Sequence, residues 1–282
     1  MTYLITGATG DVGSRVVRHL VEHGERPRVF ARDAKTAQAL FGDRVEMVQG
    51  DLGDKTSLRR ALEGIDKLFL VNSGPLIPER DAIAARAASD AGVQHLVKLS
   101  SMDVQYGLAL GVWHEQGEAA IRAGGVPFTF VRPTGFMSNL LAWARSIKSE
   151  GIVRSSTGDG RRAFIHSDDI AAVVTKVLTT PGYVSESLAI TGPEALSFAE
   201  VAERIGTVIG RELVYQFISD DEARERYSKI SGSQEETEAH VSLWRAIREG
   251  RLAKVTDTVE RVLDRKPIAL DQWVMENAGA FC

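Results

Sequence analysis

The sequence has almost no cysteine, no strong excess of either charge and no long apolar run. Its one cysteine is Cys282, so no disulfide can form within the chain, and nothing supports a disulfide-stabilised secreted protein. The formal net charge of −4 argues against nucleic-acid binding, which normally uses a basic surface. We find no secretory signal and no segment that could span a bilayer. We therefore expect a cytoplasmic monomer or homodimer without nucleic-acid or membrane partners.

The first half alternates short apolar runs with helical patterns. The apolar runs show little polar alternation, which is typical of strands that are buried on both faces of a parallel sheet. This order predicts an α/β fold in which a doubly wound parallel sheet carries helices on both faces. The predicted strands are Tyr3 to Thr6, Arg28 to Ala31, Val45 to Gln49, Lys67 to Val71, His95 to Ser100 and Phe128 to Arg132.

After about residue 133 the alternation of strand and helix patterns becomes less regular. We predict a core over residues 1–150 and a smaller α/β substrate lobe over 151–282, partly interwoven with the core. Residues 220–238 hold seven acids and three bases, which we interpret as a solvated, partly helical surface. The later elements are predicted as helices at Phe136 to Ser149, Ile170 to Leu178 and Phe198 to Ile209, with strands at Ala163 to Ile165 and Leu188 to Thr191.

A glycine-rich loop directly follows the first predicted strand. The segment Gly7-Ala8-Thr9-Gly10-Asp11-Val12-Gly13 leads into a helix whose apolar residues recur on one face. Three glycines allow a tight turn, close approach of a diphosphate and close packing of the helix on the strand. The helix N-terminus would offer N–H groups to the phosphates. We predict a dinucleotide site here, against the alternative of a turn without a ligand.

The second and third strands end in residues that can select the cofactor. Arg32 and Asp33 lie about twenty residues past the loop, where an acid binds the ribose of NAD and an arginine accommodates the 2′-phosphate of NADP. Because Arg32 comes first, we predict NADP(H), although Arg32 could also be a surface residue. Asp51 and Leu52 follow the third strand, where such folds border the adenine. Asp51 could equally be a turn or helix-capping residue.

These residues and several later segments resemble the NmrA-like atypical short-chain dehydrogenases, in particular type 2 quinone oxidoreductases and triphenylmethane reductases. The resemblance implies a Rossmann-like sheet with a small C-terminal substrate lobe, and NADPH-dependent reduction. It covers residues 2 to about 215. The matching segments are Leu4 to Gly10, Ala31 to Asp33, Gln49 to Leu52, His114 to Glu118, Pro127 to Pro133 and Ala189 to Pro193.

The usual catalytic pair of short-chain dehydrogenases is missing. In the pattern Tyr-x-x-x-Lys, the lysine lowers the tyrosine pKa and the phenol donates a proton. No tyrosine of this chain is followed four residues later by lysine. Alcohol–ketone chemistry and sugar epimerisation by that pair are therefore not expected.

His114 is the candidate catalytic residue. The resemblance places it where many NmrA-like proteins have lysine and the quinone reductases have histidine. We expect it to open the helix before the sixth strand and to bind the nicotinamide ribose or donate a proton, since imidazole titrates near neutrality. The alternative is a packed or capping histidine. Glu118, one turn later, would orient it or be a solvated helix residue.

Candidate pocket residues follow the carboxyl ends of the later strands, where open parallel sheets bind ligands. We assign some to the cofactor and some to a flat aromatic substrate; for Phe136 and Met137, core packing is the alternative. By resemblance, Pro133 would support the nicotinamide carboxamide. The cofactor candidates are Asn72, Ser73, Ser100 and Pro133, and the substrate candidates are Ser101, Phe136 and Met137.

Two other histidine patterns do not indicate a site. His19 and His23 have a spacing that can bind metal, but no third ligand is indicated, so we expect no metal. The run from His166 to Asp169 is better interpreted as a helix start, with a capping residue and acids at the positive helix end.

The sequence leaves three functions open. The first is an NADPH-dependent reductase that transfers hydride to a quinone or related flat aromatic acceptor, because the cofactor carries such chemistry without a required protein acid. The second is a non-catalytic NADP(H)-sensing regulator of the NmrA type. The third is a tailoring reductase that acts on a polycyclic aromatic pathway compound and shares the cofactor site.

Overall fold

The computed structural model describes residues 1–282, and the packing divides the chain into two units. Unit 1 contains Met1–Ser101, Val112–Pro133 and Ser167–Ala189, and unit 2 contains Met102–Gly111, Thr134–His166 and Ile190–Cys282. The chain alternates between the two units. Segments beyond residue 150 supply a strand and a helix to unit 1.

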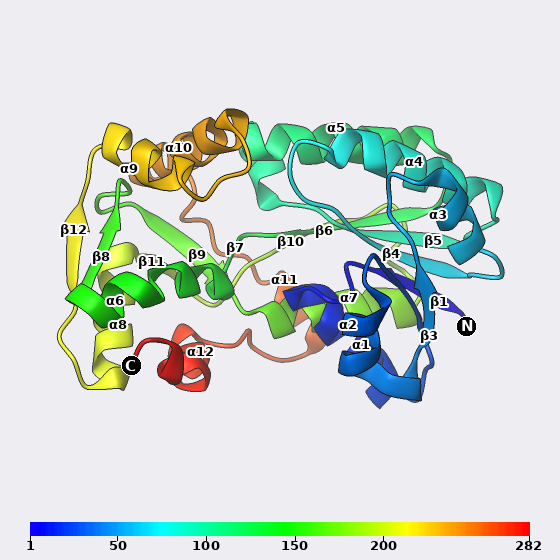
Figure 1. The fold of residues 1–282 in the computed structure, drawn as a ribbon, viewed down its shortest axis with the longest axis horizontal. Helices are drawn as coiled ribbons and strands as arrows, with labels where there is room; N and C mark the ends of the chain where they lie inside the picture. The colour runs from blue at the N-terminus through cyan, green and yellow to red at the C-terminus, as the bar shows by residue number, and fades with distance from the viewer. The chain divides into compact units, whose positions relative to one another are not determined.

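Unit 1 is built on a seven-stranded sheet (Figure 1). The registered pairs from β6 through β3 are all parallel, and Ile5 at the centre pairs with Val29 on one side and Phe69 on the other. The strand order is β10 (Ser187–Ile190), β6 (Phe128–Pro133), β5 (His95–Leu99), β4 (Lys67–Val71), β1 (Tyr3–Thr6), β2 (Arg28–Ala31) and β3 (Glu46–Gln49).

Helices cover both faces of this sheet (Figure 1). On one face, apolar side chains of α3 (Lys55–Ala61), α4 (Ile77–Asp90) and α5 (Ala109–Ala123) form a buried cluster with Leu4, Leu68 and Leu96 of the strands. On the other face lie α1 (Asp11–Glu22), α2 (Ala34–Phe41) and α7 (Ser167–Thr179). The predicted doubly wound α/β fold is confirmed.

Unit 2 contains two small sheets and several helices. The sheets are β11 (Ala195–Ser197), β9 (Arg161–Ile165) and β7 (Gly135–Phe136), and β12 (Val214–Phe217) with β8 (Ile152–Ser155). The helices are α6 (Ala144–Glu150), α8 (Phe198–Ile209), α9 (Asp220–Ser228), α10 (Gln234–Arg248), α11 (Thr258–Leu263) and α12 (Leu270–Asn277). Their core includes Phe164, Phe198, Ile247 and Trp273.

Several elements of the second half differ from the predictions. The helix predicted from Phe136 begins instead with an extended Phe136 that pairs with Ile165, then a 3₁₀ turn over Met137–Trp143, and only then α6. The acidic segment forms α9 and the start of α10, and its Asp220 accepts hydrogen bonds from Arg245 and Arg248.

No helix combines the length and hydropathy that a bilayer crossing requires.

Candidate functional site: a cavity after the first strand

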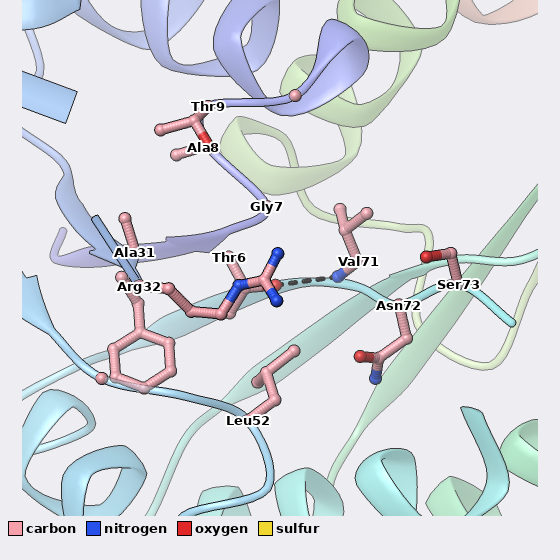
Figure 2. Close-up of a pocket in the computed structure, with 13 residues that line it drawn as sticks. Thr6, Gly7, Ala8, Thr9, Ala31, Arg32, Leu52, Val71, Asn72 and Ser73 are labelled. Atoms are coloured by element: carbon pink, nitrogen blue, oxygen red, sulfur yellow. Dashed lines mark hydrogen bonds between the residues drawn. The ribbon is translucent and has the colours of Figure 1, made fainter. Parts of the chain in front are cut away.

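A cavity of about 310 Å³ lies in unit 1 at the carboxyl ends of β1, β2 and β4 (Figure 2). Open parallel sheets bind ligands at this edge, between strands whose connections diverge. The residues that line it are Thr6, Gly7, Ala8, Thr9, Gly10, Phe30, Ala31, Arg32, Gly50, Leu52, Val71, Asn72 and Ser73. The loop after β1, the tip of β2 and the end of β4 therefore meet at one site.

The glycine loop has no room for side chains at two positions. Gly7 has a φ of +60°, and a Cβ there would lie 2.8 Å from Cβ of Val71. A Cβ on Gly13 would lie 2.2 Å from the carbonyl oxygen of Gly7, so only glycine lets α1 start this close to the loop. Gly13 and Val12 are buried and do not line the cavity; their contribution is this packing.

The N-terminus of α1 is open to an anion. Gly10 is its N-cap and provides no side-chain cap, so the first-turn N–H groups lack a capping oxygen. The Gly10 N–H itself donates to the Gly7 carbonyl at 3.0 Å, which fixes the turn. Thr9 and Gly10 line the cavity, whereas Asp11 accepts a hydrogen bond from Ser167 of α7. The loop and the helix end thus bring a helix N-terminus to the cavity, an arrangement that favours an anion such as phosphate.

At the tip of β2, the arginine and the acid have different roles. Arg32 is exposed, lines the cavity and has no hydrogen-bond or ion-pair partner for its guanidinium group (Figure 2). Asp33 instead caps α2: its carboxylate accepts from the Lys35 N–H at 2.9 Å and the Thr36 hydroxyl at 2.6 Å. The Thr36 hydroxyl and these N–H groups hold the pKa of Asp33 below its usual value. The cavity edge is therefore basic.

Leu52 lines the cavity, but Asp51 does not. The Asp51 carboxylate accepts from the Gly53 N–H at 2.8 Å and lies 4.0 Å from Arg80, so it forms the turn after β3. This is the turn alternative that the sequence left open. Gly50 does line the cavity, and a Cβ on it would lie 2.4 Å from the ring of Phe30.

Several residues that line the cavity were not predicted from the sequence, in particular Thr6, Phe30 and Val71. Thr6 Oγ1 accepts from the Val71 N–H at 2.8 Å (Figure 2) and donates to the Phe69 carbonyl at 3.0 Å. These two bonds fix β1 against β4. These residues lie inside predicted strands, where an apolar or hydroxyl side chain does not by itself indicate contact with a ligand. Their position at the carboxyl end of a strand is the feature that could have identified them.

Asn72 at the end of β4 belongs to a buried polar chain. Its side-chain amide donates to Asp81 of α4 at 2.6 Å, and Asp81 also forms an ion pair with Lys98 of β5. Asp81 and Lys98 are completely buried. The neighbouring helix α5 makes room for them, because a Cβ on Gly117 would lie 2.2 Å from an Asp81 carboxylate oxygen.

His114 lies within α5 and does not open it, since the helix starts at Ala109. Burial, together with the positive charge of Lys98, lowers the pKa of His114 to about 3. The imidazole is therefore neutral at physiological pH, unlike the near-neutral titration expected from the sequence. Its Nδ1 atom is buried without a hydrogen-bond partner.

Glu118 forms no hydrogen bond with His114, and its side chain is not exposed to solvent. It is completely buried, and it accepts from the Ser100 hydroxyl at 2.6 Å and from Arg132 Nε at 2.8 Å. Ser100 is buried and does not line the cavity, so its hydroxyl proton is used inside unit 1. Glu118 thus ties α5 to the ends of β5 and β6.

The remaining candidates are divided between the units. Ser101 follows β5, and Pro133 is the buried last residue of β6; neither lines the cavity. Phe136 is half-buried in β7 of unit 2. Met137 is 1% exposed within the hydrophobic core of unit 2, which favours the packing alternative for this residue.

Comparison with known proteins supports a single family. The pattern of the NmrA-like family matches residues 1–258. The chain is 39% identical to a (4-alkanoyl-5-oxo-2,5-dihydrofuran-3-yl)methyl phosphate reductase of Streptomyces griseus and 33% identical to an NAD(P)H azoreductase of Xenophilus azovorans, each over 99% of this chain and 98% of the relative.

A solved structure gives the same fold. The NADPH-dependent quinone oxidoreductase QOR2 of Escherichia coli, in complex with NADPH, superposes with a TM-score of 0.89 at 23% identity, covering 98% of this chain and 99% of that one. The match spans nearly the whole of both chains, and the resemblance drawn from the sequence motifs is confirmed. The chain belongs to the NmrA-like family.

Proposed function

We propose that the protein is an NADPH-dependent reductase that transfers hydride to a quinone or a related flat aromatic acceptor. The observation that carries the cofactor assignment is the unpaired Arg32 at a cavity whose neighbouring acid, Asp33, is used as a helix cap. Two relatives support the reaction class, since one is named a reductase and the other an NAD(P)H azoreductase.

The residues present fit this cofactor. The open N-terminus of α1 and the side-chain-free positions Gly7 and Gly13 would hold the diphosphate, since a Cβ at either glycine would meet neighbouring atoms. Arg32 would pair with the 2′-phosphate through charge-assisted hydrogen bonds. The apolar walls Phe30 and Leu52 would contact the adenine.

When bound, NADPH supplies the hydride, and the protein supplies position and a shaped pocket. The neutral His114 ring can donate one N–H hydrogen bond, either to the nicotinamide ribose or to an acceptor oxygen, without adding charge. Ser73 and Asn72 bring polar groups to the end of β4, and the Asp81 contact holds the Asn72 amide in place. Ser101, Pro133 and Phe136 stay candidates for the nicotinamide and substrate side.

The test is NADPH oxidation, followed by absorbance, with a panel of small quinones and an azo dye as acceptors. We expect turnover with NADPH and much weaker turnover with NADH. Tight NADPH binding without turnover on any acceptor would contradict the reductase proposal.

A non-catalytic NADP(H) sensor is the second candidate. It is favoured by one specific observation: no tyrosine of the chain precedes a lysine by four residues. A sensor would bind NADP⁺ and NADPH with the same affinity and reduce no acceptor, whereas a reductase that prefers NADPH and turns over would exclude this role. Turnover restricted to polycyclic compounds would identify a tailoring reductase.

A further inference from the structure

A second cavity, of about 650 Å³, lies entirely within unit 2. Its walls come from the 3₁₀ turn before α6, from α6 itself and from β8, α8, α9 and α10. No residue of this cavity belongs to unit 1, which contains the whole cofactor cavity. A volume of this size accommodates a small organic molecule.

Aromatic side chains form much of the wall. Trp143 and Phe198 meet edge to face with ring centroids 5.0 Å apart, and Tyr227 and Trp244 do so at 5.5 Å. The Tyr227 hydroxyl lies 3.0 Å from Nε2 of His240, whose other ring nitrogen lies 2.9 Å from the Glu236 carbonyl. Because carbonyl oxygens only accept, His240 donates to Glu236, and Tyr227 donates to His240. The rings are therefore held in fixed positions that suit a flat apolar ligand.

Two hydrogen-bond donors on residues of the wall have no partner in the structure. The indole N–H groups of Trp143 and Trp244 have no acceptor in the structure, and an indole nitrogen can only donate. The Tyr227 hydroxyl proton is already used on His240. A ligand with acceptor atoms would satisfy these donors.

The charges of the wall point to an anion. Three arginines and one acid line the cavity: Arg145, Arg154 and Arg226 against Glu150. Arg154 pairs with Glu150 at 2.6 Å, and Arg226 pairs with Glu222, which lies outside the wall, at 2.9 Å. Arg145 has no partner for its guanidinium group. One positive charge is therefore left for a ligand.

From the aromatic walls, the free donors and the unpaired Arg145, we propose that this cavity binds a flat aromatic molecule that carries an anionic group such as a carboxylate. The rings contact the aromatic body, and Arg145 pairs with the anion. The inference rests on residues of unit 2 alone, because the two cavities share no residue.

Calorimetric titration of the full-length protein with 2-naphthoate tests this proposal. We expect one binding site and, for Arg145→Gln, an affinity about tenfold lower, because the charge-assisted hydrogen bond from Arg145 to the carboxylate is lost. Arg145 is exposed on α6, so the substitution leaves the fold intact. Ala142→Trp, at another exposed position of the wall, should fill the cavity and abolish binding.

Three controls separate this cavity from other sites. Lys148→Gln removes an exposed charge of α6 that does not line the cavity, and should leave the affinity unchanged. Arg32→Ala, in the cofactor cavity, should also leave it unchanged. The neutral 2-naphthamide should bind the wild type less tightly than 2-naphthoate and lose nothing further in Arg145→Gln.

The proposal is overturned by any of three results. These are the absence of 2-naphthoate binding, equal affinities of the wild type for the acid and the amide, or binding that falls with Arg32→Ala and not with Arg145→Gln. The last result would place the probe in the cofactor cavity. Failure of NADPH turnover has no bearing on any of these measurements.

Discussion

The ammonium group of Lys98 forms an ion pair with the carboxylate of Asp81, although neither side chain has any exposure to solvent. Burial of two charges costs several kcal/mol, which the pair and the Asn72 amide offset only while both partners are present. Asn72, which donates to Asp81, also lines the cavity after β1. The ion pair is therefore connected to the cavity through one hydrogen bond.

Removal of one partner should be strongly destabilising. Asp81→Asn leaves the Lys98 charge buried and unpaired, so we expect a loss of about 3–5 kcal/mol in the free energy of unfolding, measured by urea denaturation. The matched control is Asp90→Asn, which breaks the exposed Arg86–Asp90 pair of the same helix and should cost less than about 1 kcal/mol. Equal losses would show that burial of the pair has no energetic consequence.

Gly13 should be required for the cofactor cradle. A Cβ at this position would lie 2.2 Å from the Gly7 carbonyl oxygen, so Gly13→Ala must push the start of α1 away from the loop. We expect NADP⁺ affinity to fall at least about tenfold in calorimetric titration, because the helix N–H groups move with α1.

The control for Gly13 is Gly24→Ala at the other end of α1. Gly24 has a φ of +81° and open space around its Cβ position, so this change should cost about 1 kcal/mol of stability and no cofactor affinity. If Gly13→Ala bound NADP⁺ as the wild type does, the close packing of α1 on the loop would be irrelevant to binding.

His95 should make unit 1 sensitive to acid. Burial, reinforced by the charge of Lys67, lowers the pKa of His95 to about 4, below the unfolded value of about 6.5. The unfolded chain thus binds a proton that the folded chain does not, and stability is complete above pH 6.5 and falls as pH drops towards 4. We expect His95 alone to lower the free energy of unfolding by about 2 kcal/mol between pH 7 and pH 5.

Urea denaturation at several pH values measures this effect. His95 Nε2 lies 2.8 Å from Thr129 Oγ1, whose own proton goes to the Tyr183 carbonyl, so His95 is the donor. His95→Asn retains a donor and cannot titrate, and it should flatten the pH dependence by the same amount. An unchanged slope in this variant would assign the acid sensitivity to other groups.

His114 should not appear in the pH–rate profile. Because its pKa is lowered to about 3, the ring stays neutral between pH 5 and pH 8, and kcat/KM should show no inflection from it in that range. His114→Gln keeps one N–H donor and should retain more activity than His114→Ala. An inflection near pH 6.5 that disappears in His114→Gln would mean that the imidazole is protonated in the working enzyme.

The sheet of unit 1 could be predicted from the sequence because strands such as β1 and β4 are buried along most of their length and appear as short, mainly apolar runs. The predicted bounds of β1, β2 and β4 agree with the structure, as does α8, whose Ser197 and Glu200 form a capping box. The strand that contains Lys98 could be predicted in spite of this charged residue. The pairing of Lys98 with Asp81 could not, because Asp81 lies on α4. Such a pairing depends on tertiary contacts that no local pattern shows.

The candidate site could be predicted only in part, because some of its residues are also defined by tertiary contacts. Gly7, Gly10 and Arg32 could be placed because the cradle and the strand tip have fixed spacing along the chain. Asp51 carries a side chain suited to two roles, and its contact with the Gly53 N–H is not apparent from the sequence. Short elements such as β7 and β12 gain their order from pairing with β9 and β8, which local propensity does not reveal.

The most direct test of the account compares NADP⁺ and NAD⁺ binding to the wild type and to Arg32→Ala by calorimetry. We expect the wild type to prefer NADP⁺, and Arg32→Ala to lose about 1.5–3 kcal/mol of NADP⁺ binding free energy while its NAD⁺ affinity hardly changes. Asp33→Asn, which alters the α2 cap and not the cavity, should keep the wild-type preference. Equal losses for both cofactors in Arg32→Ala, or a wild type that prefers NAD⁺, would contradict the assignment of this cavity to NADP(H).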